Sequence, residues 1–185
     1  MAINIKFSLV LLVVVGIFMA MFSIPVAKAD VYEVKETKIS AYFHDYFSVQ
    51  YTPNATDFAV VGFPGKYWNF TKFGTLCVFN DLVTEGPEPT SATVGRLQGI
   101  YVPTSFNGNY LSMFCSLVFT NEAYNGSTLQ IQGTVDQFGG VMEYSVTSGT
   151  GKFRYTNGYF TMEPISFYEP TSYMLLRINV TLKHF

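Results

Sequence analysis

The chain has 185 residues, which is enough for one ordinary domain and too few for two of comfortable size. Its 11 Lys and Arg are outnumbered by 13 Asp and Glu, so it lacks the basic excess of a nucleic-acid-binding protein and we expect no such partner. Two histidines and two cysteines are too few ligands for a zinc site, so we expect no metal, and Cys77 and Cys115 permit at most one disulfide.

Residues 1–29 have the pattern of a secretory signal peptide. A single charge, Lys6, precedes the apolar run of residues 7–22, and Ala27-Lys28-Ala29 gives the small-x-small pattern that signal peptidase recognises. A retained membrane anchor is the alternative, but a span needs about 20 apolar residues and usually lacks such a cleavage site. We predict removal of residues 1–29, which leaves residues 30–185 as a secreted domain with a net charge of −4 and no membrane contact.

The rest of the chain is patterned as strands. No stretch keeps apolar residues at helical spacing for three turns, while Asn107-Gly108 and Asn157-Gly158 supply the positive φ of tight hairpin turns. Residues 52–70, with two prolines and two sequons, are expected to form a long surface loop. Sequential antiparallel strands without helices favour an all-β fold, either a closed barrel or a sandwich. We expect eight strands, at about residues 38–49, 73–81, 93–103, 110–120, 127–135, 141–147, 153–163 and 173–184.

The first expected strand carries one chemically unusual position. Alternation puts Ile39, Ala41, Phe43, Asp45 and Phe47 on one face, so Asp45 lies among apolar neighbours. Burial disfavours the charged form of a carboxyl, so the pKa of Asp45 should rise. Such an acid can hold a proton near neutral pH and donate it to a ligand. The alternatives are a bulge that reverses the face, or an Asp45 that caps the strand end and binds backbone amides.

Four Asn-X-Ser/Thr sequons occur after the expected signal peptide. They begin at Asn54, Asn69, Asn125 and Asn179. Four sequons behind a signal peptide indicate a glycosylated extracellular protein. Asn179 falls on the polar face of the strand expected at residues 173–184, as a glycan requires.

Seven different short motifs follow one another along the chain, in an order and at a spacing that are also found in other proteins. They are YFHD (42–45), FGT (73–75), NDLVTEGP (80–87), VGRLQG (94–99), YNGST (124–128), GTGKFR (149–154) and GY (158–159). Together they resemble the motifs of plant dirigent proteins over about residues 38–185. The resemblance implies an eight-stranded antiparallel β-barrel, a homodimer or homotrimer, and a location in the extracellular space of the plant, the apoplast.

The resemblance also implies a role without oxidising power and without a cofactor. In lignan-forming members an extracellular oxidase, a laccase or a peroxidase, makes phenoxy radicals from a monolignol such as coniferyl alcohol. The barrel binds the radicals so that coupling gives one stereoisomer, and lumen acids protonate the quinone methide as it cyclises. Asp45 matches the family's first-strand lumen aspartate, and Tyr101 matches a lumen tyrosine of the third strand. Phe43 and Phe47 share the face of Asp45 and are expected to contact the phenolic ring.

The chain also departs from the lignan-forming pattern. Those relatives carry a second lumen Asp and an Arg near the hairpin between strands five and six, where this chain has Val135 and Met142. Asp136 is adjacent, but an offset of one residue points its side chain to the opposite face unless a bulge intervenes. Two alternatives therefore remain beside radical coupling. One is an enzyme that removes water from a hydroxylated isoflavonoid through a quinone methide, and the other is a structural, lignin-patterning or ligand-carrying barrel of the cell wall.

Overall fold

The computed structural model describes residues 13–15, 33–48, 54–62, 64–65 and 68–184. The chain divides into two units, Met1–Tyr32 and Glu33–Phe185. In the first unit residues 13–15 are helical, and the remainder of the predicted signal peptide, with its cleavage site, lies outside the described residues. No helix within the described ranges is both long enough and apolar enough to cross a bilayer.

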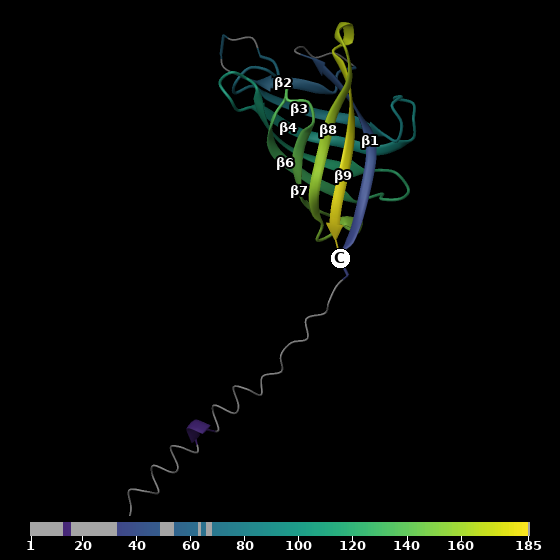
Figure 1. Ribbon diagram of the computed structural model, residues 1–185. Helices are drawn as coiled ribbons and strands as arrows, with labels where there is room; N and C mark the ends of the chain where they lie inside the picture. Colours follow the sequence, from purple (N-terminus) through teal and green to yellow (C-terminus); the bar gives the residue numbers. More distant parts are fainter. Residues whose placement is uncertain (1–12, 16–32, 49–53, 63, 66–67, 185) are drawn as a thin grey trace, which may run out of the picture. The chain divides into compact units, whose positions relative to one another are not determined.

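The described part of the second unit contains nine strands that close into a barrel (Figure 1). Neighbouring strands are antiparallel except β1 and β2, which run parallel, and β1 also pairs directly with β3 and with β9. The strands are β1 (Lys35–Ser48), β2 (Asp57–Val61), β3 (Leu76–Thr84), β4 (Thr93–Pro103), β5 (Tyr110–Phe119), β6 (Thr128–Asp136), β7 (Met142–Gly149), β8 (Asn157–Tyr168) and β9 (Tyr173–His184). The all-β class and the closed barrel are therefore confirmed.

The ninth strand lies inside a segment expected to be a loop. Residues 52–70 contain β2, so the loop prediction is wrong for Asp57–Val61. The strand has five residues and forms by pairing on both sides, with Phe58 opposite Ser48 of β1 and opposite Val78 of β3. A five-residue strand between prolines has little local signal, because its partners come from distant parts of the chain.

Several strand boundaries also differ by three to five residues from those expected: the starts of β1, β3 and β8, and the ends of β3 and β8. β3 begins at Leu76, because residues 72–75 form a turn in which the Thr75 amide donates to the Lys72 carbonyl at 3.0 Å. Gly74 adopts a φ of 77° in this turn, a value that glycine reaches without strain. β8 begins at Asn157, because Gly151–Phe153 forms a short 3₁₀ helix that buries the Phe153 ring.

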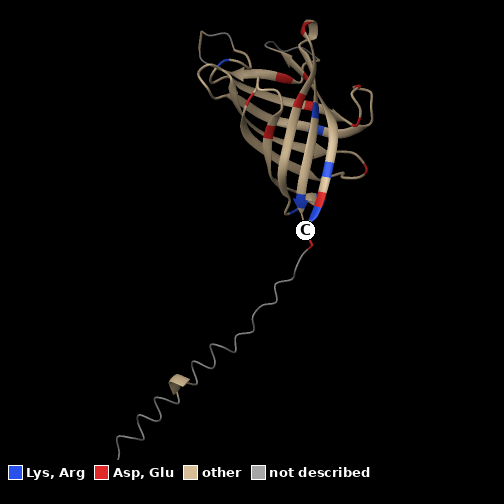
Figure 2. Cartoon of the chain, in the orientation of Figure 1, with Lys and Arg blue, Asp and Glu red and all other residues tan. Residues whose placement is uncertain are grey.

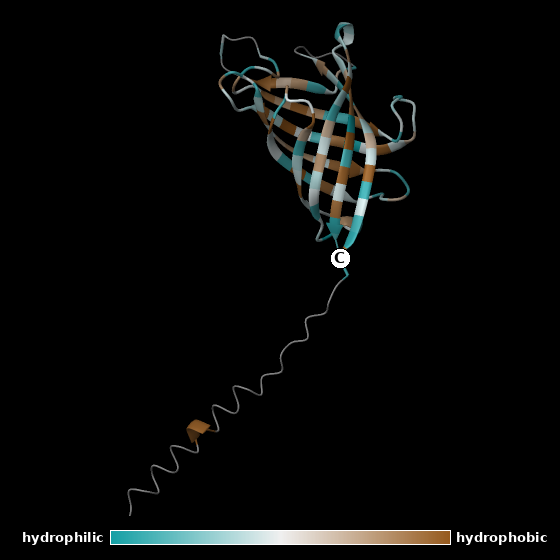
Figure 3. Ribbon diagram, viewed as in Figure 1, coloured by the Kyte–Doolittle hydropathy of each residue, from teal (hydrophilic) through white to brown (hydrophobic). Residues whose placement is uncertain are grey.

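Side chains alternate between the interior and the exterior along the strands, and Figure 3 shows the matching alternation of hydropathy on β1, β8 and β9. At the end of the barrel where β9 finishes, three aromatic rings fill the interior. The centroids of Phe119, Tyr124 and Phe153 lie 5.0–5.3 Å from one another. This aromatic plug closes one end of the barrel and leaves the interior space at the other end.

Candidate functional site

The barrel interior contains a cavity of about 430 Å³ beyond the aromatic plug. This volume is within the range of roughly 300–1,000 Å³ that small-molecule sites occupy. The strands β5 and β7–β9 line it with apolar, thioether and aromatic side chains: Leu111, Met113, Met142, Tyr144, Met162, Pro164, Met174 and Leu176. The strands β1–β4 contribute Phe43, Phe47, Phe79 and Tyr101, together with three aspartates, Asp45, Asp57 and Asp81, which we call the acidic cluster. No lysine, arginine or histidine is among the described residues that line the cavity.

Asp45 lines the cavity from β1, as the alternation predicts. β1 pairs with β9 in one unbroken register from Lys35 to Tyr46, so no bulge reverses the face at Asp45. The Oδ1 atom is buried, and no described group forms a hydrogen bond with it. Burial raises the pKa of Asp45 to about 7. The carboxyl therefore retains its proton in mildly acidic solution.

Asp57 is the first residue of β2, and 2% of it is exposed. Its Oδ2 atom accepts a hydrogen bond from the Tyr101 hydroxyl at 2.7 Å, while Oδ1 is buried without a partner in the described structure. Burial, and after it the charge of Asp45, raises the pKa of Asp57 well above its usual value, and the Tyr101 hydrogen bond opposes the shift. Tyr101 thus lies beside a lumen carboxyl, in the cavity where the resemblance places it.

Asp81 is the third member of the cluster and is fully buried on β3. The Thr56 hydroxyl donates a hydrogen bond to its Oδ1 atom, and Oδ2 is buried without a described partner. Burial and the neighbouring Asp45 raise the pKa of Asp81 to about 8, against smaller opposing effects of Thr56 and Arg96. Three carboxyls with raised pKa values therefore share one apolar cavity.

The acidic cluster can hold and donate protons near neutral pH. Ionising one carboxyl disfavours ionisation of its neighbours, so the three protons are not lost independently. An uncharged carboxyl in an apolar site is also a hydrogen-bond donor, which an ionised one is not. The arrangement suits a ligand whose oxygen atoms accept protons or hydrogen bonds.

Sequence reasoning finds Asp45 and Tyr101 but misses Asp57 and Asp81. For Asp81 a signal exists, because Cys77, Phe79 and Asp81 alternate and face inward, but the expected strand ends at residue 81. Asp57 lies in the segment expected to be a loop, where no alternation marks a face.

The side chain of Asp136 points away from the barrel interior, as expected. Val135 is buried at the inner face of β6, and Asp136 instead accepts a hydrogen bond from the Phe138 amide at 3.0 Å in the following turn. The register shift between β6 and β7 lies at Gln130 and Ile131, too far along β6 to turn Asp136 inward. With Met142 on the cavity lining, this part of the lumen is apolar.

Besides Ser172, the cavity lining has one side-chain amide among its described residues, that of Gln137. Its side-chain Nε2 atom donates hydrogen bonds to the carbonyls of Phe70 and Gly108 at 3.1 and 2.6 Å. Its backbone amide donates to the Asn109 carbonyl. Gly108 cannot be replaced easily, because a Cβ atom there would lie 2.0 Å from the Thr71 carbonyl oxygen. Gln137 thus connects three loops at the rim.

His44 belongs to the same sequence block as Asp45 but lies outside the lumen. Its Nε2 atom is 2.7 Å from the Thr84 hydroxyl and its Nδ1 atom 2.8 Å from the Tyr173 hydroxyl. Thr84 donates its own hydrogen to the Gly86 carbonyl, so it accepts from Nε2, and the Tyr173 hydroxyl donates to Nδ1. Burial lowers the pKa of His44, which agrees with this neutral ring. His44 on β1 therefore forms hydrogen bonds with the last residue of β3 and the first residue of β9.

The remaining candidate residues are placed as follows. Cys77 and Cys115 are both buried and unpaired. Within the described ranges no three His, Cys, Asp or Glu residues are placed to hold a metal ion. Figure 2 shows that the strands of the barrel carry few charges in this view.

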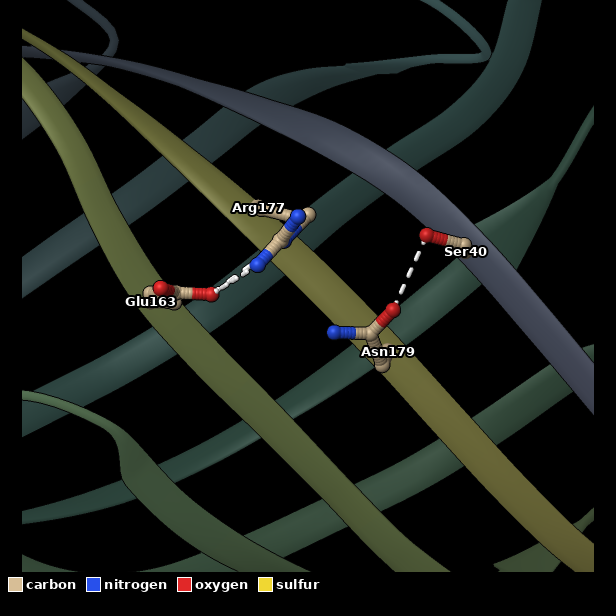
Figure 4. A network of polar contacts seen from close by, with 4 residues as sticks. All are labelled: Ser40, Glu163, Arg177 and Asn179. Atoms are coloured by element: carbon tan, nitrogen blue, oxygen red, sulfur yellow. Dashed lines mark hydrogen bonds and ion pairs between the residues drawn. The ribbon is translucent and has the colours of Figure 1, made fainter.

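None of the four sequon asparagines lines the cavity. Asn54 and Asn125 are exposed, and Asn69 is half-buried with its Oδ1 atom accepting from the amide and hydroxyl of Thr71. Asn179 lies on the outer face of β9, where it accepts a hydrogen bond from the Ser40 hydroxyl at 2.9 Å (Figure 4). The ion pair of Arg177 with Glu163 lies on the same face.

Comparison with known proteins identifies the family. The sequence model described as Dirigent-like protein matches residues 36–183. Dirigent protein 1 of Arabidopsis thaliana is 39% identical over 125 residues, which is 68% of this chain and 67% of that protein. Pterocarpan synthase 1 of Glycyrrhiza echinata is 36% identical over 129 residues, 69% of this chain and 66% of that protein. The solved structure of the pterocarpan synthase dirigent protein GePTS1 has a TM-score of 0.72 at 30% identity, and the two chains are covered to 85% and 89%. The chain therefore belongs to the dirigent protein family.

Proposed function

We propose that this chain binds phenoxy radicals of the monolignol type in its lumen and imparts regio- and stereoselectivity on their coupling. An extracellular laccase or peroxidase makes the radicals, and the barrel contributes no redox step of its own. The observation that carries the proposal is the acidic cluster: three carboxyls with raised pKa values face an apolar cavity of about 430 Å³.

The proposed chemistry needs an acid after the radicals have coupled. Coupling forms one carbon–carbon bond and leaves a quinone methide, whose oxygen gains a proton when a hydroxyl adds to the methide carbon. The proton that the hydroxyl releases balances the proton that the oxygen receives, so the step is a net isomerisation. Asp45 is the proposed donor, since its pKa of about 7 is the lowest in the acidic cluster, and it regains a proton from the attacking hydroxyl.

The apolar lining supports the same role. Phe43 and Phe47 flank Asp45 on the inner face of β1, and Phe43 meets Phe79 edge to face with ring centroids 6.3 Å apart. Aromatic side chains offer offset and edge-on contacts to a phenolic ring. The methionines of β5 and β7–β9 add flexible, polarisable contacts. Such a lining limits the access of water, which would otherwise add to a quinone methide.

The test is a coupling assay with coniferyl alcohol and a laccase, followed by chiral chromatography of the products. We expect the purified protein to give an excess of one enantiomer where the laccase alone gives a racemate. The control is Asp136→Asn, whose side chain lies outside the cavity, and it should leave the excess unchanged. Racemic products from coniferyl alcohol and from related monolignols would reject the proposed coupling function.

A second candidate is the removal of water from a hydroxylated isoflavonoid. Two observations favour it: the lumen has acids but no basic residue among its described lining, and solved pterocarpan synthase dirigent proteins are similar to this chain. Here a carboxyl donates a proton to the leaving hydroxyl and water departs. The quinone methide forms as the phenolic hydroxyl gives up its proton, which restores the carboxyl. Product would then form without any oxidase, which separates this activity from radical coupling. A purely structural role in the cell wall has less support, because the lumen retains an open cavity.

We also propose that the protein is secreted to the apoplast as a glycoprotein after residues 1–29 are removed. The exposure of Asn54 and Asn125 and the outer-face position of Asn179 support glycosylation at these sequons. N-terminal sequencing of the secreted protein is expected to begin at Asp30, and a start at residue 1 would reject the cleavage.

Self-association to a homodimer or homotrimer is proposed through the outer face of β3–β5. Val78, Ile100 and Phe114 are cross-strand neighbours there and are 39%, 40% and 55% exposed. A contiguous exposed apolar row is typical of a covered surface. We expect sedimentation to give a dimer or trimer for the unchanged chain and a monomer for the variant Ile100→Gln/Phe114→Gln. The matched control is Tyr159→Gln on the outer face of β8, which should not change the mass.

A further inference from the structure

One oxygen atom of the Asp57 carboxyl forms a hydrogen bond, and the other has no hydrogen-bond partner in the described structure. The Tyr101 hydroxyl of β4 donates to Oδ2 at 2.7 Å, which fixes the orientation of the carboxyl. The Oδ1 atom is buried, and no described group forms a hydrogen bond with it. Because Asp57 also lines the cavity, a bound ligand is positioned to supply the missing partner.

The protonation state of Asp57 follows from its surroundings. The titratable groups that affect it are Asp45, Asp81, Cys77 and Tyr101, none of which is a cation. The Tyr101 hydroxyl and the Phe58 amide favour the charged form, but burial and the two neighbouring aspartates oppose it. An ionised Asp57 would leave a charged oxygen buried without a partner, which is strongly unfavourable. With a proton on Oδ1, the same oxygen becomes a hydrogen-bond donor.

We propose that Asp57 is a protonated hydrogen-bond donor whose Oδ1–H binds an oxygen atom of an uncharged phenolic ligand, while Asp45 exchanges protons with that ligand. Tyr101 is a positioning residue, because its hydroxyl occupies Oδ2 and directs the proton of Asp57 to Oδ1. The identity of the ligand as a phenol rests on the proposed function. The donor role of Asp57 and the exclusion of anions go beyond it.

The ligand should carry no negative charge. The three carboxyls hold their protons at pH 6 and no described lining residue is basic, so a bound carboxylate would be buried without a counter-ion. Coniferyl alcohol and ferulate have closely related skeletons and differ in this respect, because ferulate bears a carboxylate. The two compounds therefore serve as matched probes of the acidic cluster.

Asparagine substitutions distinguish a residue that only donates a hydrogen bond, as proposed for Asp57, from one that transfers its proton, as proposed for Asp45. An asparagine at position 57 can accept from Tyr101 with its carbonyl and donate with its amide, so it reproduces a fixed donor. An asparagine at position 45 cannot give up a proton at all. We therefore expect Asp57→Asn to preserve ligand binding and Asp57→Leu, which has a similar volume but no donor, to weaken it.

The experiment is a calorimetric titration of coniferyl alcohol into the secreted, full-length barrel at pH 6. We expect the dissociation constant of Asp57→Asn to stay within about threefold of the unchanged chain, and that of Asp57→Leu to rise about tenfold, as for one lost hydrogen bond. Tyr101→Phe should weaken binding by less than Asp57→Leu. Ferulate should bind at least about tenfold more weakly than coniferyl alcohol. Equal weakening by Asp57→Asn and Asp57→Leu, or no weakening by the folded leucine variant, would overturn the proposal.

Infrared spectroscopy gives a readout that needs no ligand. We expect a carbonyl band of a protonated carboxyl at pH 8 that Asp57→Asn removes and Asp136→Asn retains. If Asp57→Asn removes no band, Asp57 is ionised, and the inference is rejected even if the leucine variant does not fold. A racemic coupling product, or no binding of coniferyl alcohol, counts against the proposed function and leaves the infrared result to decide the state of Asp57.

Discussion

Between about pH 6.5 and pH 8 the free energy of unfolding of the barrel is expected to fall as the pH rises, by more than about 1 kcal/mol per pH unit. Asp57 and Asp81 are buried and have raised pKa values in the fold, whereas an unfolded aspartate has a pKa of about 3.9. The fold therefore holds protons that the unfolded chain releases. Their contribution is complete below about pH 4 and is lost as the pH rises toward the folded values, at about 1.4 kcal/mol per pH unit for each carboxyl. Asp45 adds to the decrease only up to its own pKa of about 7.

His44 acts in the opposite direction in acidic solution. Its pKa is lowered by burial, so its contribution is present above the ordinary histidine value of about 6.5 and is lost as the pH falls below it. One imidazole thus opposes three carboxyls in this range, so it reduces the slope below about pH 6.5 without reversing its sign.

Urea unfolding at pH 5, 6, 7 and 8 measures the slope directly. Asp81→Asn should reduce the slope by about 1 kcal/mol per pH unit below pH 8 and raise the stability at pH 8. The outward-facing control Asp136→Asn should leave the slope unchanged. A free energy of unfolding that is flat or that increases from pH 6.5 to pH 8 would show that the cluster is ionised in the fold.

Asp45→Asn is expected to slow the proton-transfer step by at least about 100-fold, the lower range for removal of a general acid. The substitution keeps the shape of the side chain but removes the exchangeable proton. In the coupling assay, cyclised product should decrease and adducts of water should increase. In an oxidase-free assay with a hydroxylated isoflavonoid, any water loss should stop. Rates for the unchanged chain should fall as the pH rises through about 7, the pKa of Asp45.

Two controls accompany the Asp45→Asn assay. Asp45 is uncharged in the fold below pH 7, so the asparagine variant should fold with an unchanged far-ultraviolet circular dichroism spectrum. Asp136→Asn should retain full activity, because that side chain lies in a turn outside the cavity. Full turnover by a folded Asp45→Asn variant would exclude Asp45 as the proton donor.

The sequence suffices for those parts of the site that depend on local alternation. β1 is long and pairs without interruption, so the inward face of Asp45 can be counted from its neighbours. Asp81 shows the limit of this method, since the same alternation runs through β3 but its ends depend on a turn at residues 72–75. Asp57 lies beyond the limit, because β2 becomes a strand by pairing with β1 and β3. No local pattern reports contacts between segments that are distant in the sequence.

The aromatic plug of Phe119, Tyr124 and Phe153 fills one end of the barrel interior, away from the cavity. A ligand of the cavity therefore enters and leaves at the opposite end of the barrel. If two identical radicals are bound together, one lies deeper in the cavity and the other nearer its opening, so their surroundings differ although their structures do not. Because the two positions differ in depth, two identical reactants bind in different environments and in a fixed relative orientation. A fixed relative orientation is required for a product of one stereochemistry. The product is larger than either reactant, so its departure at that end is a natural slow step.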